Sequence, residues 1–294
     1  MLYQYRCWLR LQLRSYFLIP LFGINFSLTL LFDNIKHHRH QSFRKTENMT
    51  TLFLDIGNSH IKLAEKQGVK WEVVFKASNG SLEGLTEVVE QYPDINLMVV
   101  CSVREDVLNK ILDVLNFIDV KVLTSSLIDS VSLDYETPDT LGMDRFLTCY
   151  GAVSVTDHDV ICVDAGTACT VDWMTNEGIY RGGVIMPGLK LFHEMMERKL
   201  PELPSVDYYI PTQWPGKSTK QSVQWGTSGG YLVVINGFIR KYLEIIEGET
   251  DLFLTGGDSL YLSENLDSSL KVHHRPHLLF DGMEMFWKDL ERLD

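Results

Sequence analysis

The feature that most constrains this chain is a strand-and-turn segment that occurs twice. Residues 52–59 read LFLDIGNS, and residues 161–167 read ICVDAGT. In both segments an apolar run ends in Asp-x-Gly, a small polar residue follows, and a second strand-like run comes next. The repetition predicts two related halves with a cleft between them, each half carrying a hairpin whose turn contains the glycine.

Strand-like and helix-like patterns alternate through the rest of the chain. We predict strands at 51–56, 59–65, 70–76, 96–101, 120–124, 160–164, 168–174, 178–186 and 251–255. Helical patterns occupy 81–91, 104–117, 141–154, 188–199, 219–246 and 277–292. Alternation of this kind is typical of α/β architecture. We therefore predict a first domain at 49–155 and a second at 156–294.

Residues 1–48 do not fit this plan. The apolar run at 16–32 follows three arginines, as in a signal peptide, but it is shorter than the roughly 20 residues that span a bilayer. Pro20, Gly23 and Asn25 also interrupt it. Because Met49 leads directly into the first predicted strand, we interpret 1–48 as an upstream extension, either disordered or preceding the natural start, and assign it no role.

Charge and cysteine content limit which partners the protein can bind and which cellular compartment it occupies. The formal net charge is −12, and residues 49–294 alone hold 20 Lys/Arg against 37 Asp/Glu. A protein with this excess of acidic residues repels nucleic acid. We therefore expect any bound phosphate to be held by backbone N–H groups, a metal ion and a few specifically placed cationic side chains. The five cysteines form no C-x-x-C pair, which is typical of small buried side chains in a reducing compartment. We predict a cytoplasmic protein whose folded body binds neither nucleic acid nor membrane.

The residues of the two turns suit a phosphate tail and its metal ion. Gly57 and Gly166 lack a Cβ, so their backbone can approach phosphate oxygens closely. Nearby are polar donors, a lysine and two carboxylates suited to a hard cation: Asn58, Ser59, Thr167, Lys62, Asp55 and Asp164. One copy would equally fit an ordinary glycine hairpin. Two copies at equivalent places favour phosphate binding.

A candidate catalytic base lies in the segment LGMDR at 141–145. Phosphoryl transfer to an alcohol needs a carboxylate near the hydroxyl and cationic groups that hold the acceptor and the developing charge. Asp144 and Arg145 provide both at the start of a predicted helix. The same pair also fits a helix-starting aspartate followed by an arginine on a solvated face.

The histidines near the C-terminus are a weaker candidate for a metal site. His273, His274 and His277 surround Arg275-Pro276 in a predicted loop. No cysteine or carboxylate stands at ligand spacing from them, so we do not predict a metal there.

Several short motifs follow one another in the order of a known family. They are DIGNSHIK (55–62), YETPDTLGMDR (135–145), VDAGTACTVD (163–172), GGVIMPG (182–188), GKST (216–219) and TGG (255–257). Individually most are weak, but together, from Met49 to the C-terminus, they resemble type III pantothenate kinases, members of the acetate and sugar kinase/Hsp70/actin superfamily. The resemblance implies duplicated actin/ribonuclease H-like domains with an ATP cleft between them.

The resemblance also implies an activity and its residues. The reaction is transfer of the ATP γ-phosphoryl group to the primary hydroxyl of pantothenate, the first step of coenzyme A synthesis. It implies Mg²⁺, a monovalent cation (K⁺ or NH₄⁺), and a homodimer whose second protomer helps to form the substrate site. The implied nucleotide contacts are Asp55, Ile56, Gly57, Asn58, Ser59, His60, Ile61, Lys62 and Thr167. The implied pantothenate contacts are Tyr135, Gly142, Met143, Asp144, Arg145 and Thr219, with Asp144 as proton acceptor, Arg145 pairing with the carboxylate, and Asp164 as monovalent-cation ligand.

Two other functions and one departure from the family pattern stand beside this prediction. The chain could be another kinase of the superfamily, acting on a sugar or a different hydroxy acid, or a nucleotide-binding regulator without catalysis. The acidic body, the lack of a recognisable DNA-binding helix pair and the presence of Asp144 argue against the regulator. Cys169 stands where many members have Thr, so we expect one hydrogen bond fewer near the phosphates.

Overall fold

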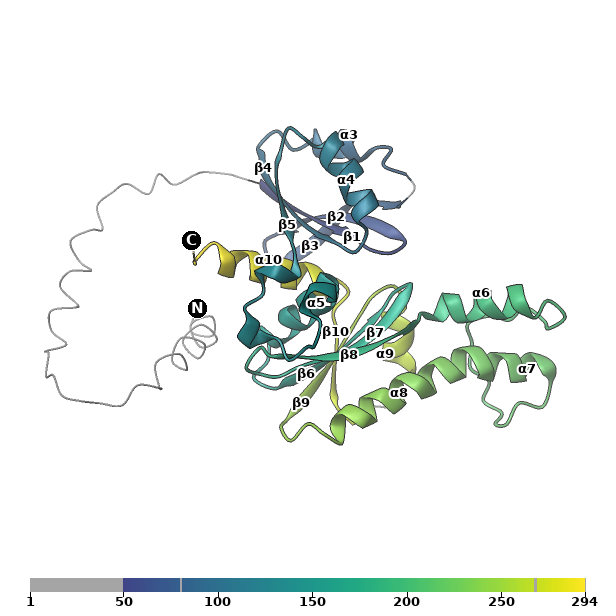
Figure 1. Ribbon diagram of the computed structural model, residues 1–294. Helices are drawn as coiled ribbons and strands as arrows, with labels where there is room; N and C mark the ends of the chain where they lie inside the picture. The colour runs from purple at the N-terminus through teal and green to yellow at the C-terminus, as the bar shows by residue number, and fades with distance from the viewer. Residues whose placement is uncertain (1–49, 80, 267–268, 294) are drawn as a thin grey trace, which may run out of the picture. The chain divides into compact units, whose positions relative to one another are not determined.

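The computed structural model describes residues 50–79, 81–266 and 269–293 of the 294-residue chain (Figure 1). From Thr51 onward the chain forms one compact unit. The interpretation of residues 1–48 lies outside the described residues. Among the helices that are described, none has the length and apolar character needed to cross a membrane.

The first sheet contains five strands in the order β3-β2-β1-β4-β5. The strands are β1 (Thr50–Ile56), β2 (His60–Gln67), β3 (Lys70–Ser78), β4 (Ile95–Ser102) and β5 (Asp119–Leu123). Leu52, Leu54 and Ile56 of β1 pack in one core with α3 (Leu85–Val89) and α4 (Glu105–Val114), whereas Phe53 belongs to a second core. Because both faces of β1 are buried, its residues 52–54 are consecutive apolar residues rather than an alternating pattern.

The second sheet repeats this arrangement with the order β10-β9-β6-β7-β8. Its strands are β6 (Asp159–Ala165), β7 (Ala168–Met174), β8 (Tyr180–Pro187), β9 (Thr250–Thr255) and β10 (Lys271–His274). In chain order, both sheets therefore run third-second-first-fourth-fifth. In both, the first three strands pair antiparallel and the last two pair parallel. The predicted duplicated α/β fold is confirmed.

Four helices accompany the second sheet: α6 (Leu189–Lys199), α7 (Thr219–Gln224), α8 (Gly230–Leu243) and α9 (Ser259–Asn265). The single helix predicted at 219–246 is confirmed in outline: the chain is helical from Thr219 to Leu243, with a π-helical segment, Trp225–Gly229, between α7 and α8. A Cβ at Gly229 would lie 2.3 Å from Cε3 of Trp225, so the indole ring occupies the space that a larger residue would need. The interruption thus accommodates the Trp225 ring at a position where only glycine fits.

The loop predicted around the C-terminal histidines is wrong, because His273 and His274 lie in the edge strand β10. The strand is only four residues long and mostly polar, so it carries little of the apolar signal that predicts strands. The His273 ring stacks on Phe253, and its Nε2 lies 3.3 Å from Oδ2 of Asp251. Within the described ranges, no three histidine, cysteine or carboxylate side chains are placed to share a metal ion.

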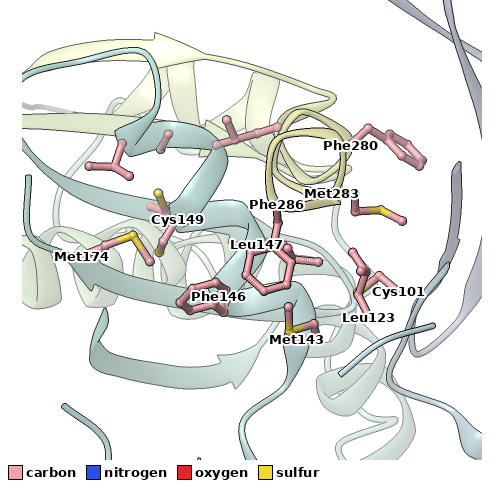
Figure 2. Close-up of a cluster of buried hydrophobic side chains, with 14 of the residues drawn as sticks. Cys101, Leu123, Met143, Phe146, Leu147, Cys149, Met174, Phe280, Met283 and Phe286 are labelled. Carbon is pink, nitrogen blue, oxygen red and sulfur yellow. The ribbon is translucent and has the colours of Figure 1, made fainter. Parts of the chain in front are cut away.

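Two helices, α5 (Met143–Val153) and α10 (Leu278–Leu290), pack on each other in the largest apolar core. Figure 2 shows that residues of the first sheet, such as Cys101 and Leu123, lie in the same cluster. The crossing is very close: a Cβ at Gly282 would lie 1.9 Å from the carbonyl oxygen of Leu147, and one at Gly151 would lie 2.7 Å from that of Leu278. Glycine is needed here because the helix backbones touch.

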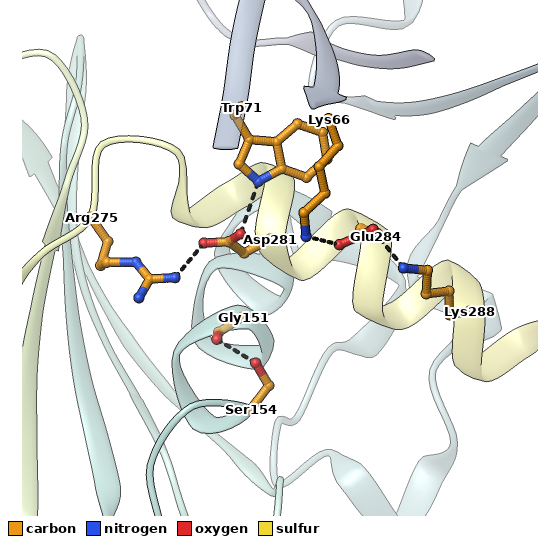
Figure 3. A network of polar contacts seen from close by, with 8 residues as sticks. All are labelled: Lys66, Trp71, Gly151, Ser154, Arg275, Asp281, Glu284 and Lys288. Atoms are coloured by element: carbon orange, nitrogen blue, oxygen red, sulfur yellow. Dashed lines mark hydrogen bonds and ion pairs between the residues drawn. The ribbon is translucent and has the colours of Figure 1, made fainter. Parts of the chain in front are cut away.

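Polar contacts also tie α10 to the β2–β3 hairpin of the first sheet (Figure 3). Trp71 Nε1 donates to Asp281 Oδ1 at 2.8 Å, and Arg275 Nη2 donates to Asp281 Oδ2 at 2.9 Å. Lys66 forms an ion pair with Glu284 and lies over the Trp71 ring. The last helix therefore contacts both strands of this hairpin, through Lys66 of β2 and Trp71 of β3.

We expect Gly282→Ala to lower the free energy of unfolding by about 2 kcal/mol or more, because overpacking a tight contact between backbones forces the helices apart. The matched control is Gly237→Ala in α8, where a Cβ meets nothing within 4 Å. There the change should be neutral or stabilise the protein by up to about 1 kcal/mol, because glycine is a poor helix former. Urea unfolding of both variants measures the difference, and equal stability would contradict the described crossing.

Candidate functional site

The first predicted phosphate turn joins β1 to β2 and is fixed by backbone hydrogen bonds. Gly57 N donates to the carbonyl of His60 at 3.0 Å. The side-chain amide of Asn79, at the end of β3, donates to the carbonyls of Gly57 and Asn58 at 2.7 and 2.9 Å. Asn79 thus occupies two carbonyls of the turn, and the N–H of Gly57 is taken by His60, so an anion would meet the N–H groups of Asn58 and Ser59.

Asp55 and Lys62 face each other across the same hairpin. They are register partners in β1 and β2, and Lys62 Nζ lies 3.4 Å from Asp55 Oδ2. Burial raises the pKa of Asp55, and the nearby ammonium of Lys62 partly opposes that rise. Ile56 and Ile61 are buried in the core, so only their backbone atoms remain for contact with a nucleotide.

The second turn joins β6 to β7 and is enclosed by two other glycine segments. Gly188 N donates to the carbonyl of Thr167 at 2.9 Å. A Cβ at Gly188 would lie 2.0 Å from the carbonyl oxygen of Gly166, and one at Gly256 would lie 2.4 Å from Asp164 Oδ1. Gly188 of GGVIMPG and Gly256 of TGG must be glycines because both press against the second turn.

A hydrogen bond joins the two turns directly. The hydroxyl of Thr167 donates to that of Ser59, with 2.9 Å between the oxygens. Residues that lie far apart in the sequence therefore meet at one point, with the Asp-x-Gly segment of each sheet beside it. The two repeated turns are therefore brought side by side.

Lysines surround the first turn. The pKa of His60 is lowered, first by burial and then by the positive charges of Lys76, Lys62 and Lys190. Lys76 comes from β3 and Lys190 from α6 of the second sheet. In a body with a large excess of acidic residues, these ammonium groups provide local positive charge suited to phosphates. Sequence reasoning singled out Lys62 but missed Lys76 and Lys190, because nothing local marks them.

Asp144 is the second residue of α5 and lies close to both turns. Its Oδ1 accepts a hydrogen bond from Arg145 N at 2.9 Å, and a Cβ at Gly142 would lie 2.6 Å from the same oxygen. Burial is the main cause that raises its pKa to about 6, with repulsion from Asp55 and Asp172 adding to the shift. A carboxylate with such a pKa can accept a proton near neutral pH.

Asp164 shares this electrostatic environment. Its pKa is raised to about 7, chiefly by burial and then by repulsion from Asp144, while the positive charge of Lys62 opposes the rise. Asp55 repels it as well. The three aspartates thus lie close enough to influence one another's protonation, which is the clustering expected of a functional site.

The donor set fits a metal ion that is held largely by the nucleotide. No three ligating side chains in the described part of the chain converge on one point, so an all-protein metal cage is not formed there. Mg²⁺ commonly binds through one or two carboxylates together with phosphate oxygens and water. Asp55 and Asp164 are the residues that would hold it or a monovalent cation beside the phosphates, where the cation would neutralise developing charge.

Arg145 is buried and already has an anionic partner. Its Nε and Nη2 lie 3.0 and 2.6 Å from Oδ1 of Asp172, which also accepts a hydrogen bond from the Tyr180 hydroxyl at 2.8 Å. The side chain of Tyr135 hydrogen-bonds to Arg145 as well. Tyr135 and Arg145 are thus brought together as the resemblance implied, whereas Asp172 was missed because it closes an apolar strand motif.

The side chains of two predicted site residues are not brought to the site. Met143 is buried in the core, so its side chain does not face a ligand. Thr219 is exposed at the start of α7, and none of its described contacts joins it to Asp144. Cys169, where many members of the family have Thr, is buried in the core of the second sheet, and the expectation of one hydrogen bond fewer near the phosphates stays a prediction.

Comparisons with known proteins show which family the chain belongs to. The family model for type III pantothenate kinase matches residues 51–241. The chain belongs to the type III pantothenate kinase family. A type III pantothenate kinase of Flavobacterium johnsoniae is 31% identical over 74% of this chain and 90% of the relative, and one of Phocaeicola vulgatus is 32% identical over the same shares. The expected identity as an ATP-dependent kinase of this family is therefore confirmed.

One solved structure supports the fold. It is a Campylobacter jejuni protein described as a Baf family transcriptional activator, with a TM-score of 0.56. It is 23% identical and covers 82% of this chain and 99% of its own. At this identity the likeness concerns the arrangement of the backbone and says nothing of the reaction.

The protonation of Asp144 predicts a pH dependence. A base acts as the carboxylate, so kcat/KM should fall about tenfold per pH unit as the pH drops below about 6, and should level off above about 7. If Asp164, whose pKa is about 7, must be ionised to bind a cation, the fall of kcat/KM on the acidic side of the profile should be steeper. Initial rates from pH 5 to 8.5, with melting curves at each pH as control, test this. A flat profile in folded protein would contradict it.

Proposed function

We propose that the protein transfers the γ-phosphoryl group of ATP to the primary hydroxyl of pantothenate, giving 4'-phosphopantothenate and ADP. The proposal is carried by one observation: Thr167 and Ser59 bring both Asp-x-Gly turns together beside Asp144. Membership of the type III pantothenate kinase family supports pantothenate as the acceptor. The chain spans 90% of the length of the curated relatives from Flavobacterium johnsoniae and Phocaeicola vulgatus.

In the proposed mechanism the nucleotide phosphates lie against the two turns. Backbone N–H groups of Asn58 and Ser59, the hydroxyls of Ser59 and Thr167, and Lys62 would hold them, since a site that neutralises phosphate charge lowers the barrier to transfer. Asp144 takes the proton of the acceptor hydroxyl as the oxygen bonds to the γ-phosphorus. The bond from that phosphorus to the bridging oxygen breaks, and ADP leaves with the electron pair.

The acceptor would lie between Asp144 and the Arg145–Tyr135 pair. Its hydroxyl must be within hydrogen-bonding reach of Asp144 for proton transfer. Its carboxylate is a suitable partner for the guanidinium of Arg145, because arginine binds carboxylates through parallel N–H donors. In this proposal Asp164 holds a monovalent cation, K⁺ or NH₄⁺. The proposed domains, 49–155 and 156–294, each contribute one of the two turns.

The decisive variant is Asp144→Asn. It preserves the shape of the side chain and removes the proton acceptor, so we expect kcat to fall at least 100-fold while ATP binding and the melting temperature change little. The matched control is Asp139→Asn, an exposed residue five positions earlier. Coupled ADP release with pantothenate, and with a sugar panel, measures both. Full activity in Asp144→Asn, or transfer to a sugar but not to pantothenate, would refute the proposal.

We also propose that the active form is a homodimer built through the second half. Apolar side chains are exposed on α6, on α8 and in the segment between α6 and α7: Leu191, Met195, Leu200, Tyr208, Tyr209, Trp214, Val233 and Val234. Exposed apolar surface of this extent is typical of an interface. Thr219 lies at the end of the same segment and would then contact the substrate of the neighbouring protomer.

We further propose a cytoplasmic location, which agrees with the four described cysteines, all unpaired and buried.

Val233→Lys should weaken the dimer, because a charge is placed on a helix surface that the proposal buries. The control is Val69→Lys, which is 90% exposed in the β2–β3 turn. Light scattering coupled to size-exclusion chromatography should give a dimer for the wild type and the control, and a larger monomer fraction for Val233→Lys. A monomeric wild type with full activity would contradict the proposed dimer.

A further inference from the structure

Asp172 is a charged side chain with no access to solvent and no role in the transfer described above. It lies in β7, and its side chain is 2% exposed. Its Oδ1 accepts hydrogen bonds from Arg145 Nε, Arg145 Nη2 and the Tyr180 hydroxyl. The side chain of Thr170 hydrogen-bonds to it too. Every one of these contacts stabilises the ionised carboxylate, which otherwise would be costly to bury.

Glycines stand next to Asp172, where a larger residue would collide with its carboxylate. A Cβ at Gly183 would lie 1.9 Å from Asp172 Oδ1 and 2.6 Å from the carbonyl oxygen of Val171. Gly183 is the register partner of Asp172 on β8, and the pairing of the two strands is irregular just beyond it. The adjacent Gly182 has a φ of 89° and lies against the ring of Tyr135. The paired glycines of GGVIMPG therefore fit around the Asp172–Arg145–Tyr135 group.

The geometry of the pair determines which part of Arg145 remains available. A guanidinium has five N–H donors in a fixed plane. Asp172 engages the edge formed by Nε and Nη2, and Tyr135 hydrogen-bonds to the same side chain. Arg145 thus cannot turn freely within its buried site. The contacts with Asp172 use Nε and Nη2, so Nη1 lies at the opposite edge of the guanidinium.

We propose that Asp172 is the positioning residue of the acceptor site. By holding the Nε edge of Arg145, it presents the opposite edge, together with the Tyr135 hydroxyl, to the carboxylate of the acceptor. Asp172 itself touches no substrate. This inference rests on the proposed function, because it assigns a part of the pantothenate site.

The proposal predicts an effect that depends on the acceptor's carboxylate. Asp172→Asn keeps the size of the side chain but removes the charge that fixes Arg145. We expect KM for pantothenate to rise at least about tenfold, as is typical when a charged hydrogen bond is lost, while kcat stays within about threefold. Pantothenyl alcohol has the same reacting hydroxyl and no carboxylate. Its KM, or its inhibition constant against pantothenate, should change less than about twofold.

A milder pair of variants covers the case in which Asp172→Asn does not fold. Tyr180→Phe removes one hydrogen bond to Asp172 and leaves the ion pair, so KM for pantothenate should rise about threefold. Tyr242→Phe is the matched control, because its hydroxyl donates to the backbone carbonyl of the neighbouring Val171 at 3.0 Å. It removes a comparable bond from the same strand and should leave KM unchanged.

The outcomes separate the inference from the function on which it rests. A larger KM for pantothenate but not for the alcohol, in Asp172→Asn or in Tyr180→Phe, supports the positioning role. Equal losses for both acceptors, or a fall in kcat alone, would show that Asp172 serves stability only and would overturn it. A wild type that binds or phosphorylates no pantothenate would instead refute the proposed function.

Discussion

The hydrogen bond between Thr167 and Ser59 is the contact on which the site depends, because it joins turns that belong to different sheets. Each turn ends the first strand of a sheet with the same strand order. An Asp-x-Gly turn at that position offers exposed backbone and a carboxylate. One such turn alone is not sufficient to hold a nucleoside triphosphate. Bringing two copies together doubles the donors while the glycines of neighbouring segments keep side chains out of the way.

This convergence has an electrostatic cost. Asp55 is buried, Asp144 and Asp164 are partly buried near it, and the loss of solvent raises the pKa of each above its usual value. Between about pH 4 and pH 7 the folded protein therefore holds protons that the unfolded chain has lost, so its stability without ligand falls as the pH rises. Cations bound beside these carboxylates would offset that repulsion. The site is thus least stable when it is empty and ionised, which favours ligand binding at neutral pH.

The sequence predicted what is encoded locally and missed what is encoded by partners. The two turns, β1, β6 and Asp144 were predicted because apolar strands, glycines and a helix start leave short-range signals. The role of Asp172 could not be predicted in the same way, since its partner Arg145 comes from another element. β10 was missed because a short, polar edge strand lacks an apolar pattern. The interruption at Trp225–Gly229 reflects how Trp225 packs, which periodicity does not report.

The most direct test of the central claim is the affinity of Mg²⁺-ATP measured by calorimetry for Ser59→Ala, Thr167→Ala and the double variant. If both turns contact the same phosphates, each single change should weaken binding by about three- to tenfold, and the two effects should not simply add, because the hydroxyls touch each other. If either single variant binds the nucleotide as tightly as the wild type, the two turns do not share one nucleotide, and the account is wrong.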